Sequence, residues 1–366
     1  MNAVYQGRAS RTSSPSDLVA IPYISVIVPV RNEAGYIAET LRQLLAQEYP
    51  SNRLEILVAD GRSTDETRTI VSAIAAEFPR VRLLDNPRRL SSAGRNVAVK
   101  ASHGDLILLI DGHCQIDNPR YLLDLADAFE RSGADSVGRP QPLDVRGATW
   151  TQQAIAQARS SFLGHHPASH IYTDREGFVP PQSVAVAYRR EVFERVGPFD
   201  ERFDACEDVE FNHRLGRAGL SCYFTPRATV KYQPRGSLVK LFRQMTRYGR
   251  GRVRLLRKHR DTFSLAGFVP AVFLLGLVLG PLLSSLFDPL WFVYLGTLTV
   301  YAFLVCFASL QCAARSRQPL LLALLPAVFV TVHLGAGWGL CCEAVAGLFA
   351  RGGRGSCRAG RHGEFT

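Results

Sequence analysis

The chain has 366 residues, of which 47% are hydrophobic, and a formal net charge of +11. Its length and apolar content are sufficient for a buried core, so a disordered protein is not the default expectation. The eight cysteines form no CxxC pair, so neither a zinc site nor a disulfide framework is indicated.

The first 22 residues predict a flexible tail. They are polar and rich in Ser, and they lack the apolar core that a secretory signal requires. We therefore expect the domain that follows to remain in the cytosol.

Residues 23–235 predict one α/β domain with a mostly parallel central sheet. Strands are expected at 25–30, 54–60, 81–84 and 106–110, and helices at 33–47, 65–78 and 91–101. The strands are short and apolar throughout, as in a parallel sheet covered by helices on both faces. Domains of this kind commonly bind nucleotides at the carboxyl ends of their strands.

Two polar segments follow strands of this domain. One is PVRNE at 29–33, and the other begins with Asp60 and continues as GRSTDET. An acidic residue at a strand end can accept hydrogen bonds from a base or a ribose. Residue type alone favours Asp60 as a turn-former or helix cap, and Asp65 is better explained as a helix cap.

A third segment delivers Asp111, Gly112 and His113 from the very apolar strand at 106–110. A carboxylate and an imidazole at a strand end could hold a divalent cation that neutralises a nucleotide diphosphate. Imidazole suits Mn²⁺ better than Mg²⁺. The alternative is an Asp-Gly turn followed by a solvated histidine.

The second half of the domain contains a long polar loop and an acidic helix start. The loop covers 163–182 and carries three histidines to which we assign no metal site. Glu207 and Asp208 begin an amphipathic helix with Phe211 and Leu215 on its apolar face. A carboxylate here could take a proton from an attacking hydroxyl. The alternative is that both acids are present only because the helix dipole stabilises negative charge in the first turn.

Residues 236–261 predict basic helices at a membrane surface. Between Arg235 and Arg260 there are ten Lys or Arg and no Asp or Glu, directly before an uncharged segment. This adjacency indicates anionic lipid and not nucleic acid.

Residues 262–350 predict a membrane domain with three apolar segments, at 263–287, 289–314 and 319–342. Each exceeds the roughly 20 residues that a spanning helix needs. A buried soluble hairpin is disfavoured because soluble helices seldom run this long without a charge. An odd number of spans would place the basic tail at 351–366 outside, against the positive-inside rule, so the third segment could instead be re-entrant around 335–339.

The order of these motifs resembles that of inverting family 2 glycosyltransferases, across residues 24–250, and most of all their succinoglycan or exopolysaccharide branch. The matching segments are SVIVPVRNE, ILVADGRSTDET, AGRNVAVKASHGDLILLIDGH, the Glu-Asp pair and Gln-x-x-Arg-Tyr. The resemblance implies a glycosyltransferase-A type fold, a nucleoside-diphosphate sugar donor, and Mn²⁺ or Mg²⁺. His113 stands where the family has a second Asp, and Tyr248 stands where it has Trp.

The resemblance also implies roles for single residues. In the nucleotide pocket it places Pro29, Arg31 and Glu33, with Asp60 on the base and Arg95 on the nucleotide or its phosphates. It makes Asp111 a donor-binding residue that holds the metal together with His113. Asp208 becomes the catalytic base with Glu207 beside it, and Gln244, Arg247 and Tyr248 lie near the acceptor and the donor diphosphate.

These implications predict a multi-pass hexosyltransferase of the bacterial inner membrane, with its catalytic domain in the cytosol. The acceptor is expected to be a lipid-linked saccharide in surface or exopolysaccharide synthesis, with membrane lipids but no nucleic acid as further partners. The alternative enzyme is a polyprenyl-phosphate sugar synthase, whose acceptor is a lipid phosphate. A nucleotidyltransferase is disfavoured because a glycine-rich phosphate loop is lacking, and a transporter because three short spans are too few.

Overall fold

The computed structural model describes residues 21–165 and 169–355. Most of the N-terminal tail expected at 1–22, His166 of the polar loop, and residues 356–366 of the basic tail lie outside these ranges.

One sheet of eight strands forms the centre of the first domain within the described residues, in the order β3-β2-β1-β4-β8-β6-β9-β7. Its strands are β1 (Ile24–Val30), β2 (Leu54–Asp60), β3 (Val81–Asp85), β4 (Leu106–Leu109), β6 (Ser136–Gly138), β7 (Gly177–Phe178), β8 (Ala185–Arg189) and β9 (Cys222–Phe224). Strands β1 to β4 are parallel, whereas β8 is antiparallel to both of its neighbours. The expected mostly parallel α/β sheet is confirmed.

Helices cover both faces of this sheet. Successive side chains of a strand point to opposite faces, and because these strands are apolar throughout, both faces need to be covered. Val26 and Val28 join a core with α1 and α4, whereas Ile27 joins the core of α3, α6 and α7 on the other face. The helices are α1 (Ile37–Leu45), α2 (Thr67–Glu77), α3 (Ser91–Ala101), α4 (Tyr121–Ser132), α5 (Trp150–Ser160), α6 (Arg190–Val196) and α7 (Glu207–Arg217). The register of β1 with β2 and β4 brings their carboxyl ends to one edge.

A second, two-stranded sheet fixes the segment that follows this edge. Its strands β5 (Cys114–Gln115) and β10 (Lys231–Tyr232) are antiparallel. This pairing brings residues about 120 positions apart in the sequence next to one another, directly after Asp111 and His113.

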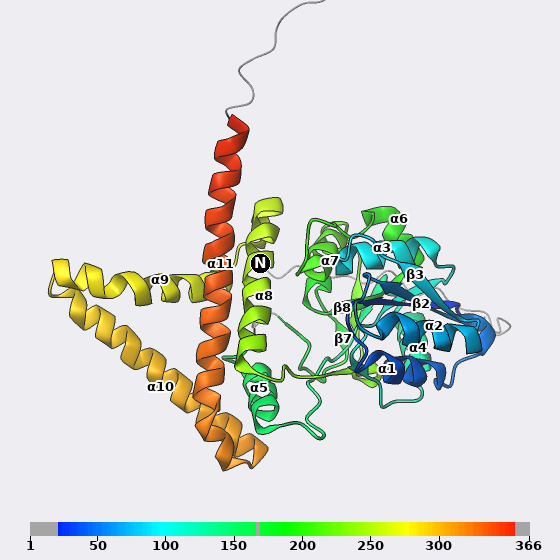
Figure 1. Ribbon diagram of the computed structural model, residues 1–366, viewed down its shortest axis with the longest axis horizontal. Coiled ribbons are helices and arrows are strands. Elements are labelled where there is room, and N and C mark those ends of the chain that lie inside the picture. The colour runs from blue at the N-terminus through cyan, green and yellow to red at the C-terminus, as the bar shows by residue number, and fades with distance from the viewer. Residues whose placement is uncertain (1–20, 166–168, 356–366) are drawn as a thin grey trace, which may run out of the picture.

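Four long helices follow the second sheet, and Figure 1 shows them on one side of the α/β domain. They are α8 (Leu238–Lys258), α9 (Leu265–Leu286), α10 (Leu290–Ser316) and α11 (Leu325–Gly355). Segments Leu265–Leu286, Leu290–Ser316 and Leu325–Leu348 are each long and apolar enough to cross a membrane. Helix α11 continues without a break through 335–339, so the re-entrant turn considered for that segment does not form.

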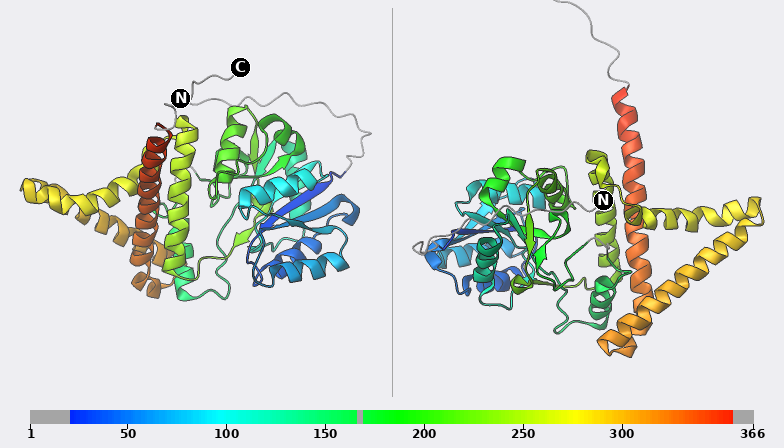
Figure 2. Two further views of the ribbon diagram at one scale, coloured as in Figure 1. Left: turned by 45° about the horizontal axis from the view of Figure 1, so that its top comes forward. Right: turned by 180° about the vertical axis from the view of Figure 1, so that it is seen from behind.

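The three apolar helices differ in how much protein covers them. Helices α8 and α11 lie side by side, while α9 and α10 form a hairpin that projects away from the α/β domain (Figures 1 and 2). In the most apolar part of α9 none of the residues is buried, compared with 6% in α10 and 44% in α11. Helix α11 is therefore partly covered by protein, whereas α9 and α10 are almost uncovered.

Glycines permit the close contact between α8 and α11. A Cβ atom on Gly339 would overlap the backbone oxygen of Thr246, and one on Gly249 would overlap that of Ala336. A Cβ on Gly335 would lie 2.9 Å from the Cβ of Met245. The two helix backbones can approach this closely only because these positions lack side chains.

We expect Gly339→Ala to destabilise the protein by about 1–3 kcal/mol, because the backbone of Thr246 cannot yield to the added methyl group. The measurement is the temperature at which half of the detergent-solubilised protein loses its monodisperse peak. Gly276→Ala in α9 is the matched control, since its Cβ would meet nothing within 4 Å. Equal transition temperatures for the two variants would contradict this role of the α8–α11 contact.

Candidate active site

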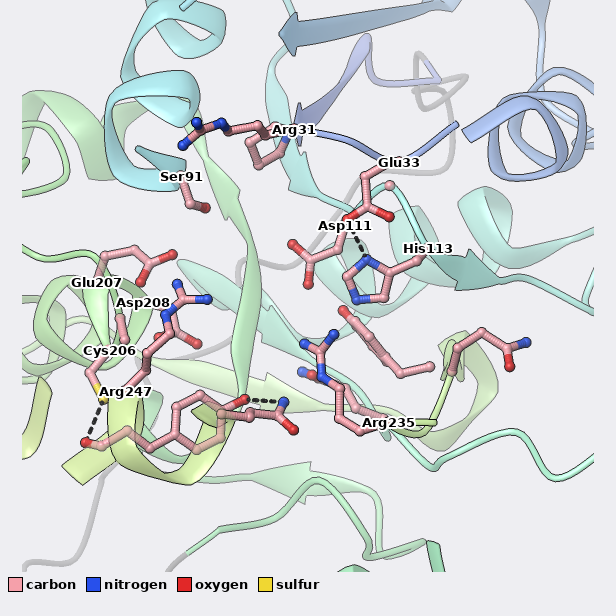
Figure 3. Close-up of a pocket in the computed structure, with 18 of the residues that line it drawn as sticks. Arg31, Glu33, Ser91, Asp111, His113, Cys206, Glu207, Asp208, Arg235 and Arg247 are labelled. Atoms are coloured by element: carbon pink, nitrogen blue, oxygen red, sulfur yellow. Dashed lines mark hydrogen bonds and ion pairs between the residues drawn. The ribbon is translucent and has the colours of Figure 1, made fainter. Parts of the chain in front are cut away.

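A cavity of about 670 Å³ opens at the edge where the parallel strands end, and α8 forms its opposite wall. Eleven of the twelve site residues expected from the sequence line it. These are Pro29, Arg31, Glu33, Arg95, Asp111, His113, Glu207, Asp208, Gln244, Arg247 and Tyr248. Figure 3 shows part of this lining, with Asp111 and His113 across the cavity from Glu207 and Asp208. Residues from five separate parts of the sequence thus meet at one site.

Asp60 is the expected residue that is absent from the cavity wall. Its fully buried carboxylate accepts a hydrogen bond from Ser63 Oγ at 2.6 Å and pairs with Arg68 at 3.3 Å. These contacts hold the turn after β2, as the turn-former alternative predicts. A contact between Asp60 and the base remains a prediction.

The turn after β1 is held by the segment that follows β2. Asn32 adopts a left-handed conformation with φ of 58°, and its side-chain oxygen accepts from the backbone of Thr64 at 2.8 Å. The backbone of Glu33 donates to Thr67, whose own backbone and hydroxyl both donate to Asp65. Asp65 therefore lies one residue before the N-cap of α2, which is Glu66, and is not itself the cap that the sequence suggested. This network positions Arg31 and Glu33 over the cavity.

Asp111 and His113 leave the end of β4 with Gly112 between them. A Cβ on Gly112 would lie 2.8 Å from a methyl group of Val30, so only glycine lets the turn pass so close to β1. His113 Nδ1 lies 3.1 Å from Glu33 Oε1. The other ring nitrogen, Nε2, takes no part in this hydrogen bond. Burial alone would lower the pKa of His113, but the bond to Glu33 and the charge of Asp111 raise it above its usual value.

Arg95 connects the two halves of the cavity from its place in α3. It is only 8% exposed, and its guanidinium lies 3.4 Å from Glu207 and 3.8 Å from Asp111. The guanidinium also lies 5.5 Å above the ring of Phe199. Burial would lower the pKa of Arg95, but the surrounding carboxylates raise it, so Arg95 stays charged.

The two acids at the start of α7 have different environments. Glu207 is buried against Arg95, and burial raises its pKa above its usual value. Asp208 is exposed, and its Oδ1 accepts a hydrogen bond from the backbone of Val209 at 2.8 Å. Both acids lie in the first turn of α7, where the helix dipole stabilises them, and both also line the cavity. A role in chemistry is therefore compatible with stabilisation by the dipole.

Helix α8 contributes the wall that faces these acids. Arg247 donates to the backbone oxygen of Asp204 at 2.6 Å, and Gln244 donates to the hydroxyl of Tyr248 at 3.1 Å. The loop that leads into α7 therefore rests on α8, which holds Glu207 and Asp208 in place.

Several cavity residues were not expected from the sequence. Arg159, Arg235, Tyr172 and Tyr232 also line the wall. Tyr232 and Arg235 reach it because β10 pairs with β5, and the sequence assigned Arg235 only to the basic surface stretch. Arg159 belongs to α5, where its spacing gave no signal of a site.

Comparisons with known proteins agree with this geometry. A family model described as "Glycosyltransferase like family 2" matches residues 22–251. The chain is 36% identical over 247 residues to the succinoglycan biosynthesis protein ExoA of Rhizobium meliloti (strain 1021), covering 67% of this chain and 73% of that protein. It is 24% identical over 327 residues to a dolichyl-phosphate-linked sugar transferase of Methanococcus voltae named "Dolichyl N-acetyl-alpha-D-glucosaminyl phosphate 3-beta-D-2,3-diacetamido-2,3-dideoxy-beta-D-glucuronosyltransferase", covering 87% of this chain and 95% of that protein.

A solved structure shares the fold. It is the mannosyltransferase PcManGT from Pyrobaculum calidifontis in complex with GDP-Man and Mn²⁺, with a TM-score of 0.53 and 21% identity. The alignment covers 91% of this chain and 89% of that one. With a family match over more than half of its length and the expected cavity at the strand ends, the chain belongs to glycosyltransferase family 2 and is a transferase enzyme.

Proposed function

We propose that this glycosyltransferase moves a hexose, with inversion, from a nucleoside-diphosphate sugar to a lipid-linked saccharide at the cytosolic face of a bacterial inner membrane. One observation carries the proposal: the cavity that holds Asp111, His113 and Asp208 is walled by α8, the basic helix that packs on the apolar helices. An acceptor attached to a membrane lipid would meet the donor at this wall. The similarity to proteins named for succinoglycan and dolichyl-linked sugar synthesis supports the same acceptor class.

Asp208 is the proposed catalytic base. In the reaction an acceptor hydroxyl oxygen bonds to the anomeric carbon, the bond from that carbon to the diphosphate breaks, and the hydroxyl proton passes to Asp208. Attack opposite the leaving group inverts the configuration. Glu207 is paired with Arg95 and buried, so it positions the start of α7 and leaves proton transfer to the exposed Asp208.

Asp111 and His113 fit a divalent cation. The carboxylate of Asp111 is partly exposed to the cavity, and the bond from His113 Nδ1 to Glu33 orients the ring so that Nε2 can act as a ligand. When bound, such an ion would neutralise the diphosphate leaving group. An imidazole ligand favours Mn²⁺ over Mg²⁺, and the solved PcManGT complex contains Mn²⁺.

Arginines supply the remaining positive charge for phosphate groups. Arg159 of α5, Arg235 of the loop before α8 and Arg247 of α8 itself line the part of the cavity next to α8. These side chains would suit a donor diphosphate or the phosphate of a lipid carrier. The same feature favours the second candidate, a polyprenyl-phosphate sugar synthase, whose phosphate acceptor needs no base.

Asp208→Asn distinguishes the two candidates. With a saccharide acceptor we expect kcat to fall by about 10²–10⁴-fold, because the amide cannot take the hydroxyl proton. The measurement is steady-state transfer by purified protein in lipid nanodiscs. Glu191→Gln, an exposed acid in the first turn of α6 outside the cavity, should leave kcat unchanged. Near-full turnover by Asp208→Asn would instead indicate a phosphate acceptor.

Removal of divalent ions by EDTA should abolish transfer, and Mn²⁺ should restore it better than Mg²⁺. His113→Ala should raise the Mn²⁺ concentration for half-maximal activity by at least about 10-fold, because a direct ligand is lost and losing only a residue that supports a ligand typically costs that much. His113→Asp should retain activity and shift the preference toward Mg²⁺, since carboxylates suit that ion. His103→Ala, outside the cavity, is the control. Full activity in EDTA would contradict the metal assignment.

The acceptor class is tested by incubating membranes that contain the protein with a panel of radiolabelled sugar nucleotides. We expect the label from one donor to enter the organic lipid extract and to be released by mild acid, which cleaves sugar diphosphates from their lipid. Membranes that contain Asp208→Asn are the matched control. Label confined to the aqueous phase would rule out a lipid-linked acceptor.

A further inference from the structure

Helices α8 and α11 are aligned in parallel along their lengths. Gly249 of α8 contacts the backbone of Ala336, and Thr246 contacts Gly339. Further along both helices, Arg254 pairs with Glu343 at 3.1 Å. Position 249 of α8 is therefore level with the middle of the apolar segment Leu325–Leu348.

This alignment decides where α11 can lie relative to a membrane. Arg247 and Arg250 flank Gly249, and both are exposed. If α11 crossed the bilayer, these two charges and the adjacent cavity wall would lie near the centre of the hydrocarbon. Charged side chains at that depth are costly unless a partner or water neutralises them. Helix α8 is basic along its whole length, so no shift along its axis avoids this.

Unlike α11, the α9–α10 hairpin lies apart from the basic helix α8, and its helices are long enough to span the bilayer. It contacts α11 near Gly337 and then projects away from α8 and from the catalytic domain (Figures 1 and 2). Helix α9 has 22 residues, a length of about 33 Å, which matches the roughly 30 Å of bilayer hydrocarbon. The tip contains Asp288, Trp291 and Tyr294, and aromatic residues are typical of the membrane interface.

The uncovered face of α11 is apolar. Leu334, Trp338, Val345 and Leu348 follow one another at helical spacing, and the last three are 51%, 50% and 70% exposed. The glycines that contact α8 lie on a different face. A helix with protein on one side and an apolar stripe with a tryptophan on another suits the membrane surface.

We propose that α9 and α10 are the spanning helices of the described chain, and that α11 lies along the membrane surface beside α8. The partner of the Trp338–Leu348 stripe is then the headgroup and upper acyl region of the leaflet on the catalytic side. Both ends of the membrane domain lie on that side. The arginines at the end of the sequence then agree with the positive-inside rule, which three spans would violate.

Sidedness is tested on the full chain in a bacterial inner membrane. Green fluorescent protein fused to either terminus should fluoresce, and alkaline phosphatase fused to either should be inactive. Alkaline phosphatase inserted after Asp288 should be active, because the hairpin tip lies on the opposite side. Active phosphatase at the C-terminus together with fluorescence at the N-terminus would show that α11 crosses the membrane and would overturn the proposal.

Depth is tested independently with Trp338 as the single tryptophan, in the variant W150F/W291F. In bilayers of brominated lipid we expect at least twofold stronger quenching by bromine near the headgroup than by bromine near the chain end. The matched control adds W338F and F303W, which places the tryptophan in the middle of α10 and should reverse the ratio. Stronger quenching of Trp338 by the deep bromine would contradict a surface position, whatever the enzyme's acceptor.

Discussion

The charge of Arg95 holds the two halves of the active site together. Its buried guanidinium lies between Asp111, at the end of β4, and Glu207, at the start of α7. Removing either carboxylate would leave a buried charge with fewer partners, which is strongly unfavourable. The two ion pairs of Arg95 therefore fix the distance between the proposed metal-binding end of the sheet and the start of α7. Asp208, the proposed base, takes part in neither pair and is free to accept a proton.

Helix α8 extends this constraint to the apolar helices. Toward the catalytic domain, Arg247 binds the backbone of Asp204 in the loop that precedes α7. Arg254, two turns further along the same face, binds the carboxylate of Asp204 and also pairs with Glu343 of α11. One basic helix thus forms a wall of the cavity and a support for the apolar helices. In the proposed arrangement, its charges would attract anionic lipid and keep α8 at the level of the headgroups.

Most of the catalytic fold was predictable from the sequence, because its signals are local. The apolar strands at 54–60 and 106–110 and the helix at 91–101 were expected at or within one residue of their observed bounds. Motif order also indicated the residues of the cavity. It did not indicate Arg159 or Arg235, because their positions depend on the packing of α5 and on the pairing of β10 with β5.

The sequence by itself determined the family, the parallel sheet, the motif residues and the presence of three long apolar helices, since strand alternation, turn residues and hydropathy are properties of short segments. Only the tertiary structure decided that Asp60 holds a turn outside the cavity wall, that Glu207 is buried while Asp208 is exposed, and that α11 runs unbroken beside α8. Hydropathy measures how apolar a helix is. Hydropathy does not record which neighbour covers that helix. A basic helix such as α8, packed at the level of the midpoint of α11, changes where α11 can lie in a bilayer.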